Sequence, residues 1–221
     1  MHRTRTALIA GASGLVGSHL LRLILLTDRY SQVISIGRRE LPVIHPKLDQ
    51  QIVDFDNLQK AKSELVADDV FCCLGTTIKK AGSKEAFYKV DHDYVTKLAV
   101  VTLEKKATQF LVVSSMGADA DSRIFYNKVK GEMERDIRQM GFTAVHIFRP
   151  SLLLGEREEH RTGEEISAKI MRPLSALMIG PLRKYRPIQA ETVAKAMLEA
   201  AAQNQKGDKV YLSDEIERLG S

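Results

Sequence analysis

The chain has 221 residues, of which 44% are hydrophobic and 28% are charged. The hydrophobic share is too high for a disordered chain, and the length suits one domain that buries its own core without metal or disulfide bonds. The 33 Lys and Arg residues exceed the 28 Asp and Glu residues by a net charge of +5. Because the basic residues are spread along the chain, they do not predict a nucleic-acid-binding arm.

The cysteines and the apolar runs of the chain exclude further classes of protein. Cys72 and Cys73 are adjacent and make poor disulfide partners, and the His and Cys residues share no metal-ligand spacing. The longest apolar run, Leu20–Leu26, contains Arg22 and is too short to cross a membrane. The first residues lack the apolar stretch of a signal peptide. We therefore expect a cytoplasmic setting, no metal site and no membrane insertion.

Short β-branched runs alternate with longer segments of helical period. This alternation predicts an α/β fold, namely a Rossmann-type doubly wound parallel sheet with helices on both faces. The predicted strands are Thr6–Ala10, Gln32–Ile36, Gln50–Asp54, Asp69–Leu74, Gln109–Ser114, Thr143–Phe148 and Lys209–Ser213. The predicted helices are Leu15–Thr27, Lys84–Lys105, Ile124–Met140 and Ala190–Gln203.

Residues 151–187 break this alternation. The segment begins with a run of charged residues and then contains Pro173, Pro181 and Pro187. Ligands of doubly wound folds bind beyond the carboxyl ends of the strands, where an irregular insert commonly covers the pocket. We therefore expect residues 1–221 to form a single domain in which 151–187 is a small substrate-pocket insert in a short C-terminal region.

Three glycines, Gly11, Gly14 and Gly17, follow the first predicted strand and open the first predicted helix. At this spacing, the first glycine permits a tight turn, the second lets the backbone approach a pyrophosphate, and the third lets the helix pack closely on the strand. The alternative is an ordinary glycine-rich turn. The loop predicts a dinucleotide site whose contacts come from Gly11, Ser13, Gly14, Leu15, Val16 and Gly17.

The end of the second predicted strand indicates which dinucleotide binds. NAD-binding sites usually place an Asp or Glu there for the ribose 2′-hydroxyl, whereas this chain has Arg38 and Arg39. Guanidinium groups suit the 2′-phosphate of NADP because they bind phosphate as a fork. Glu40 lies one residue further and keeps NAD as the alternative. We expect NADPH as the cofactor.

Tyr126 and Lys130 lie four residues apart on a predicted helix, so their side chains share one face. The preceding strand ends in Ser114 and Ser115. With the glycine loop, this arrangement resembles the short-chain dehydrogenase/reductase superfamily, in its atypical or extended form. The sequence is similar to those of the Tat-interacting-protein branch, whose members are NADPH-binding and epimerase-like. The resemblance rests on the glycine loop, Asp54, Leu74–Thr77, Val90–Tyr94, Ser114–Ser115, Tyr126/Lys130 and Arg149–Pro150.

The resemblance implies a catalytic mechanism. Tyr126 would donate a proton to a substrate carbonyl oxygen while NADPH delivers a hydride to the carbon. Lys130 would help the phenol release its proton through its positive charge, and would bind the nicotinamide ribose. Ser115 would hold the carbonyl by a hydrogen bond, with Ser114 as the alternative.

The resemblance also implies further cofactor contacts. Asp54 would lie near the adenine, Leu74 and Gly75 would run along the cofactor, and Tyr94 would approach it from the next helix. Leu153 and Arg161 would close over the nicotinamide end. Tyr126 and Lys130 would complete the set at the nicotinamide ribose.

These features predict an NADPH-dependent oxidoreductase that reduces a small carbonyl substrate, as a monomer or a homodimer. One alternative is a non-enzymatic, NADPH-sensing protein that binds a regulatory protein partner. A nucleotide-sugar epimerase-like enzyme is a further alternative, although only 71 residues follow Pro150 and epimerases need a large substrate lobe.

Overall fold

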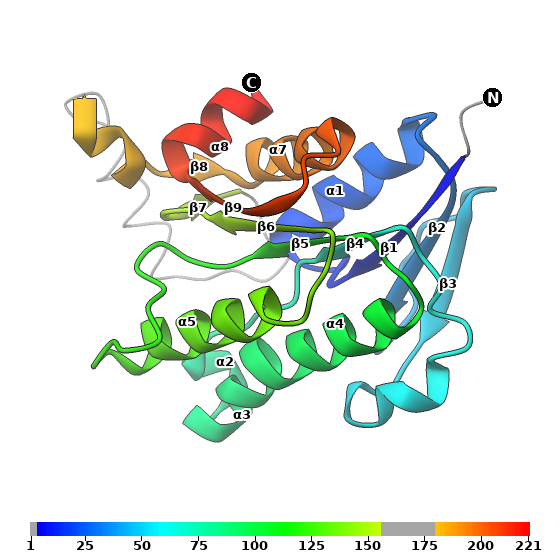
Figure 1. The fold of residues 1–221 in the computed structure, drawn as a ribbon, viewed down its shortest axis with the longest axis horizontal. Helices are drawn as coiled ribbons and strands as arrows, with labels where there is room; N and C mark the ends of the chain where they lie inside the picture. The colour runs from blue at the N-terminus through cyan, green and yellow to red at the C-terminus, as the bar shows by residue number, and fades with distance from the viewer. Residues whose placement is uncertain (1–3, 156–179) are drawn as a thin grey trace.

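The computed structural model describes residues 4–155 and 180–221 of the chain. Seven parallel strands form one sheet in the order β3-β2-β1-β4-β5-β6-β9, with helices on both faces (Figure 1). This architecture confirms the predicted fold class. The strands are β1 (Arg5–Ala10), β2 (Tyr30–Gly37), β3 (Leu48–Ile52), β4 (Asp69–Cys72), β5 (Gln109–Val113), β6 (Ala144–Arg149) and β9 (Gly207–Leu212).

The sheet buries both of its faces against helices. In β1, Ala7 and Ile9 belong to the core beneath α1, α7 and α8, whereas Leu8 and Ala10 belong to the core beneath α4 and α5. Such alternation is what a strand covered on both sides requires. The helices are α1 (Leu15–Leu26), α2 (Ile78–Ala81), α3 (Lys84–Tyr88), α4 (Tyr94–Glu104), α5 (Phe125–Arg138), α7 (Ala190–Gln203) and α8 (Ser213–Gly220). A 3₁₀ helix spans Phe55–Ala61, a π-helical turn spans Lys89–Asp93, and a second 3₁₀ helix spans Gly180–Tyr185.

The strand order reverses beside β1. The chain runs outward from β1 to β2 and β3, and then returns to β4 on the other side of β1. Ala10 of β1 pairs with Cys72 of β4, so the segments that follow these strands leave the sheet at the same level. Ligands of open α/β sheets bind at such a switch point, which places the glycine loop where a dinucleotide is expected.

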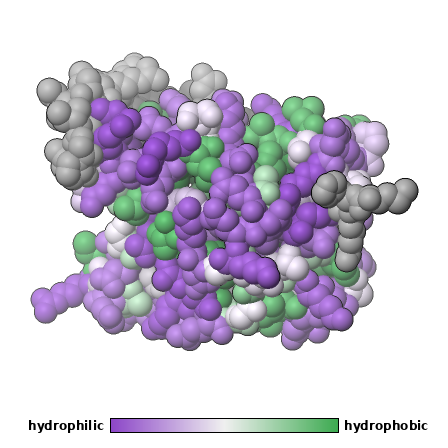
Figure 2. Space-filling view, turned by 45° about the horizontal axis from the view of Figure 1, so that its top comes forward, coloured by the Kyte–Doolittle hydropathy of each residue, from purple (hydrophilic) through white to green (hydrophobic). Residues whose placement is uncertain are grey.

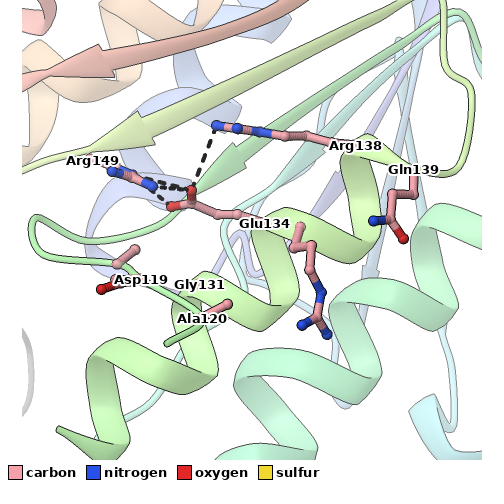
Figure 3. Close-up of a pocket in the computed structure, with 9 residues that line it drawn as sticks. Asp119, Ala120, Gly131, Glu134, Arg138, Gln139 and Arg149 are labelled. Carbon is pink, nitrogen blue, oxygen red and sulfur yellow. Dashed lines mark hydrogen bonds and ion pairs between the residues drawn. The ribbon is translucent and has the colours of Figure 1, made fainter. Parts of the chain in front are cut away.

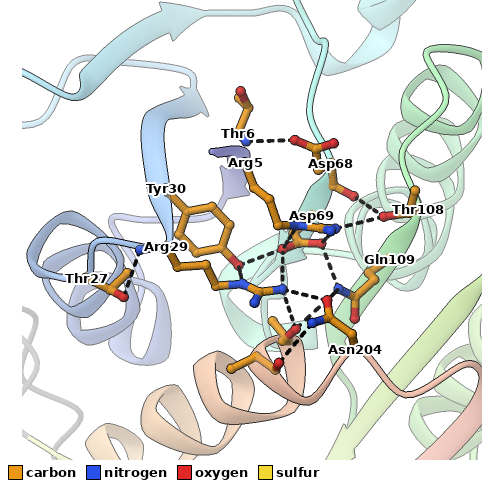
Figure 4. A network of polar contacts seen from close by, with 12 residues as sticks. Arg5, Thr6, Thr27, Arg29, Tyr30, Asp68, Asp69, Thr108, Gln109 and Asn204 are labelled. Carbon is orange, nitrogen blue, oxygen red and sulfur yellow. Dashed lines mark hydrogen bonds and ion pairs between the residues drawn. The ribbon is translucent and has the colours of Figure 1, made fainter. Parts of the chain in front are cut away.

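A buried polar network joins the strands at their amino ends (Figure 4). Asp69, at the start of β4, is fully buried. Its carboxylate accepts hydrogen bonds from Arg5 of β1, from the Tyr30 hydroxyl of β2 at 2.8 Å and from Gln109 of β5 at 2.9 Å. The Arg29 guanidinium lies 3.3 Å from the same carboxylate and also donates to the Ala201 carbonyl at the end of α7. One carboxylate therefore ties four strands and a helix together.

The predicted helix Lys84–Lys105 is a continuous helical segment that contains the π turn, and its regular part ends at Glu104. Helices α2 and α8 were not predicted from the sequence, and Ser213 was expected at the end of a strand. In the structure Ser213 begins α8, because the Glu215 side chain accepts the Leu212 backbone N–H and starts a helix there.

The two ends of the predicted insert lie side by side. The short strands β7 (Leu153–Leu154) and β8 (Ile188–Gln189) pair in parallel, apart from the main sheet. The remainder of the insert, residues 156–179, lies outside the described residues, and so does Arg161. One domain with a small insert therefore stays a prediction.

Hydrophilic side chains cover most of the face in Figure 2, with hydrophobic ones in smaller groups between them. Large exposed hydrophobic residues include Leu26, Ile44 and Ile124. No helix in the described ranges has the length and apolar character that a membrane span requires. Within residues 4–155 and 180–221, no group of three or more His, Cys, Asp or Glu residues could hold a metal ion.

Candidate functional site

The glycine loop fits its predicted role because side chains would not fit there. Gly11 has a φ of +85°, and a Cβ on it would lie 2.5 Å from the Cys73 carbonyl oxygen. A Cβ on Gly17 would lie 2.2 Å from the Gly11 carbonyl oxygen. Such distances are far below van der Waals contact, so the turn and the close packing of α1 both require glycine.

The start of α1 is suited to an anion. Gly14 is the N-cap residue, no side chain caps the helix, and the first turn contains no acidic residue. The first N–H groups of the helix and its dipole therefore favour a negative group. Ser13 and Gly14 are exposed at this end, while Val16 is buried. The residues present thus fit a pyrophosphate.

The segment after β4 connects this loop to α5. Cys73 lies against Gly11, and two residues later a Cβ on Gly75 would lie 3.8 Å from the Lys130 ammonium and 3.4 Å from an Asp91 carboxylate oxygen. Leu74 packs partly buried against the core beneath α4 and α5. The structure therefore places Leu74 and Gly75 between the glycine loop and Lys130.

Lys130 forms a buried ion pair that the sequence analysis did not predict. Its ammonium lies 2.7 Å from the Asp91 carboxylate, with side chains only 5% and 1% exposed. Burial disfavours the charged ammonium, but the Asp91 carboxylate and then Tyr126 outweigh it, so the pKa of Lys130 lies above its ordinary value. Tyr126 lies one turn earlier on α5, half-buried, with its ring 5.4 Å from that of Phe87.

The role of Asp91 had one signal in the sequence. Phe87, Asp91 and Val95 are spaced four residues apart on one helical segment, and all three are buried. A carboxylate at an apolar helix position needs a buried partner, which is a sign of a functional or structural ion pair. The resemblance includes the motif Val90–Tyr94 but implies no role for Asp91.

The two serines after β5 have different surroundings. The Ser114 hydroxyl is buried and donates to Glu134, whose carboxylate also accepts hydrogen bonds from Nε and Nη2 of Arg149. The Ser115 hydroxyl oxygen is buried and has no hydrogen-bond partner among the described residues. Within the described residues, the Ser114 hydroxyl is therefore engaged by Glu134, whereas the Ser115 hydroxyl is not engaged.

A pocket of about 370 Å³ lies beside a cluster formed by Glu134, Arg138 and Arg149 (Figure 3). Two of its lining residues pack closely together, since a Cβ on Gly131 would lie 2.1 Å from the Ala120 backbone nitrogen. The Arg149 guanidinium points toward Glu134, 2.6 Å from its carboxylate, and Arg138 lies 3.9 Å from the same group. These ion pairs hold the loop after β5 against α5 and β6, so we assign the cluster a structural role.

The predicted adenine-end residues lie at the ends of β2 and β3. Arg38 and Arg39 are exposed directly after β2. Asp54 accepts hydrogen bonds from Asn57 at 2.6 Å and from the Asp56 backbone at 2.9 Å, which lower the pKa of its carboxyl. Asp54 thus caps the 3₁₀ helix that follows it, and no sequence motif indicated this capping role.

Tyr94 and Leu153 complete the predicted set within the described residues. The Tyr94 ring lies 5.4 Å from the ring of Phe55, the residue of that 3₁₀ helix that follows Asp54. Leu153 is half-buried in β7, and Gly155 two residues later approaches Leu15 of α1 so closely that a Cβ would lie 2.8 Å from it. The start of the insert therefore lies beside the glycine loop.

A doubly wound parallel sheet with a glycine loop at its switch point defines the class of NAD(P)-binding Rossmann proteins. The sequence matches the NAD dependent epimerase/dehydratase family over residues 7–212. The chain belongs to this family, within the extended short-chain dehydrogenase/reductase type of fold, which confirms the predicted resemblance.

Two relatives are similar over most of their length. Protein HTATIP2 of Rattus norvegicus is 39% identical over 171 residues, which cover 76% of this chain and 70% of the relative. Protein FMP52, mitochondrial, of Saccharomyces cerevisiae is 34% identical over 211 residues, which cover 92% and 90%. The first of these confirms the predicted similarity to the Tat-interacting-protein branch.

Solved structures share the fold at low sequence identity. The Bordetella bronchiseptica enzyme WbmH in complex with NAD+ has a TM-score of 0.70 at 16% identity, covering 99% of this chain and 80% of that chain. MoeE5 in complex with UDP-glucose and NAD has a TM-score of 0.67 at 16% identity, covering 97% and 80%. Both neighbours bind NAD, and the likeness does not distinguish NADP from NAD for this chain.

The expected cytoplasmic setting is wrong. The fungal relatives, among them those of Saccharomyces cerevisiae and Candida glabrata, are named as mitochondrial proteins. The expectation rested on the lack of an apolar signal segment, and organellar proteins do not need such a segment.

Proposed function

We propose that this protein is an NADPH-dependent reductase of a small carbonyl compound. The observation that carries the proposal is the position of Gly75, which follows the strand beside the glycine loop and lies next to the Lys130 ammonium. A dinucleotide whose pyrophosphate rests on α1 would run along this segment toward Lys130 and Tyr126. NADPH, when bound, supplies the hydride for the carbonyl carbon.

The side chains of the chain itself would position the substrate and supply the proton. The Ser115 hydroxyl, which has no hydrogen-bond partner within the part of the chain that the structure describes, would hydrogen-bond the carbonyl oxygen and hold it in place. Tyr126 would donate its phenolic proton to that oxygen, and Lys130 would stabilise the negative charge left on the phenol. Lys130 would also donate to the ribose hydroxyls of the nicotinamide end. The Ser114 hydroxyl would stay on Glu134 throughout.

We expect Tyr126→Phe to lower turnover by about 10²–10⁴-fold, because the phenolic proton is lost while the ring remains. The measurement is NADPH oxidation over a library of aldehydes and ketones, together with the NADPH dissociation constant, which should change little. Tyr88→Phe is the matched control, since the Tyr88 ring lies 4.6 Å from the His92 ring at a tilted angle and its hydroxyl interacts with Glu132. Unchanged turnover in Tyr126→Phe would contradict the proposed role of this residue.

Arg38 and Arg39 are proposed to select NADPH over NADH by binding the 2′-phosphate. Replacing both with Ala should raise the NADPH dissociation constant about 10- to 100-fold, because hydrogen bonds to a charged group contribute about 1.5–3 kcal/mol, and should leave that of NADH nearly unchanged. Arg22→Ala, at an exposed position on α1, is the control. An equal rise in the dissociation constants of NADPH and NADH would show that the arginines do not bind the 2′-phosphate.

A second candidate function is an NADPH-sensing regulator that binds a protein partner. The similarity to Protein HTATIP2 at 39% identity supports it, because the Tat-interacting-protein branch takes its name from an interaction with another protein. Affinity capture with and without NADPH tests this function, and identical partners under both conditions would count against it. An epimerase-like activity is supported by the family name alone, and incubation with UDP-glucose and the dinucleotide tests it directly.

A further inference from the structure

We propose that Asp91 is a positioning residue of this site, whose carboxylate keeps Lys130 charged and fixes the segment after β4 beside it. The proposal rests on the proposed function, since it gives Lys130 and Gly75 their places at the nicotinamide end. It adds a residue for which the sequence analysis had no role.

The two carboxylate oxygens of Asp91 have different partners. One oxygen lies 2.7 Å from the Lys130 ammonium, and the other accepts the Thr76 backbone N–H at 2.8 Å. Thr76 directly follows Gly75, which lies over the ion pair. A single side chain therefore couples the segment that would contact the cofactor to the helix that carries Tyr126 and Lys130.

The helix that carries Asp91 is irregular at this position. Asp91 lies in the middle of the π turn Lys89–Asp93, between the regular helices α3 and α4. A π turn inserts one residue into a helix and reorients the side chains beside it, and such turns are frequent at functional sites. Here the buried carboxylate in the turn reaches both α5 and the segment after β4.

The charge of Asp91 is the feature that Lys130 depends on. The groups that face Lys130 are Asp91 from the π turn, Tyr126 from its own helix and Cys72 from β4. Burial raises the pKa of the Cys72 thiol to about 12, so this group is neutral at physiological pH. A buried ammonium without a counter-charge prefers its neutral form. Asp91 is therefore what allows Lys130 to stay charged.

Asp91→Asn separates the two roles, because the amide oxygen still accepts the Thr76 N–H while the negative charge is lost. Without that charge, burial lowers the pKa of Lys130 in the folded protein below its value in the unfolded chain, about 10.4. Between those two values the unfolded state binds more protons, so stability rises with pH. The stability deficit of the variant should therefore shrink as the pH rises, whereas a packing defect would cost the same at every pH.

The test is urea unfolding of wild type, Asp91→Asn and the control Asp93→Asn at pH 7 and at about pH 9.5, with NADPH affinity measured at both values. Asp93 lies in the same turn, with a side chain 41% exposed beside His92. We expect Asp91→Asn to have a lower urea midpoint than wild type at pH 7, and a midpoint close to that of wild type at the higher pH. Its NADPH dissociation constant should be about tenfold higher than that of wild type. Asp93→Asn should differ from wild type equally at both pH values.

An Asp91→Asn deficit that is the same at both pH values would overturn the proposal. If wild type does not bind NADPH, the proposed function fails, and the unfolding measurements still decide whether Asp91 keeps Lys130 charged. If Asp91→Asn does not fold, the single variant Lys130→Met is compared with the double variant that carries both Lys130→Met and Asp91→Asn. The double variant, which buries no unpaired charge, should have the higher urea midpoint, and equal midpoints would overturn the proposal.

Discussion

Replacing Asp69 with Ala is expected to lower the free energy of unfolding by about 3–5 kcal/mol, the usual cost of removing one partner from a buried ion pair. Asp69 has no exposed surface and is contacted by Arg5, Arg29, Tyr30 and Gln109. The substitution leaves these polar groups without their common acceptor, at the point where four strands meet. Burial, followed by the Asp69 charge, already raises the pKa of Tyr30, so the hydroxyl is held as a neutral donor.

Chemical unfolding in urea measures this effect, with Asp208→Ala as the control. Asp208 lies exposed in the edge strand β9, and its replacement should change the free energy of unfolding by less than about 0.5 kcal/mol. A loss below about 1 kcal/mol for Asp69→Ala would show that the two arginines reach solvent without cost, and that the network does not hold the sheet together.

Two substitutions in the glycine loop should affect the stability of the fold and the binding of a dinucleotide to different extents. Gly17→Ala is expected to abolish measurable dinucleotide binding and to cost about 1–3 kcal/mol of stability, because its Cβ would meet the Gly11 carbonyl at 2.2 Å and backbone cannot move aside easily. Gly14→Ala should cost less stability than Gly17→Ala, since its Cβ would lie 3.2 Å from the Gly11 carbonyl oxygen, a tight contact that a backbone shift of a few tenths of an ångström relieves. It should still weaken binding at least about tenfold, because a methyl group there keeps the pyrophosphate from the backbone.

Ser18→Ala is the matched control for both variants. Its hydroxyl only donates to the Leu15 carbonyl within α1, at 3.2 Å, so folding and binding should both be retained. Calorimetric titration and urea unfolding on the same preparations measure the two effects. Full NADPH affinity in Gly14→Ala would mean that the dinucleotide does not approach this turn.

The architecture could be predicted from the sequence because it depends on patterns that are local. β-Branched runs such as Phe110–Val113 alternate with amphipathic segments such as α5, and the structure contains each predicted strand within a few residues. The glycine loop could be predicted for the same reason, since its three positions are set by the turn between one strand and one helix. The helices α2 and α8 were missed because segments of four and eight residues show too little helical periodicity.

The remaining contacts depend on which segments meet across the fold. Asp91 and Lys130 are 39 positions apart, and Ser114 and Glu134 are 20 apart. The buried helix position of Asp91 does not indicate that Lys130 is its partner. No local pattern indicates that Ser114 is engaged while Ser115 lacks a hydrogen-bond partner among the described residues. Asp54 and Tyr94 were placed by resemblance, and the structure shows them near the same 3₁₀ helix.

Calorimetric titration of the purified 221-residue chain with NADPH measures whether the glycine loop and the segment after β4 bind a dinucleotide. We expect one site per chain, with tighter binding of NADPH than of NADH and loss of binding in Gly17→Ala. No heat of binding with either dinucleotide, from a chain that unfolds cooperatively, would show that this site does not bind a dinucleotide.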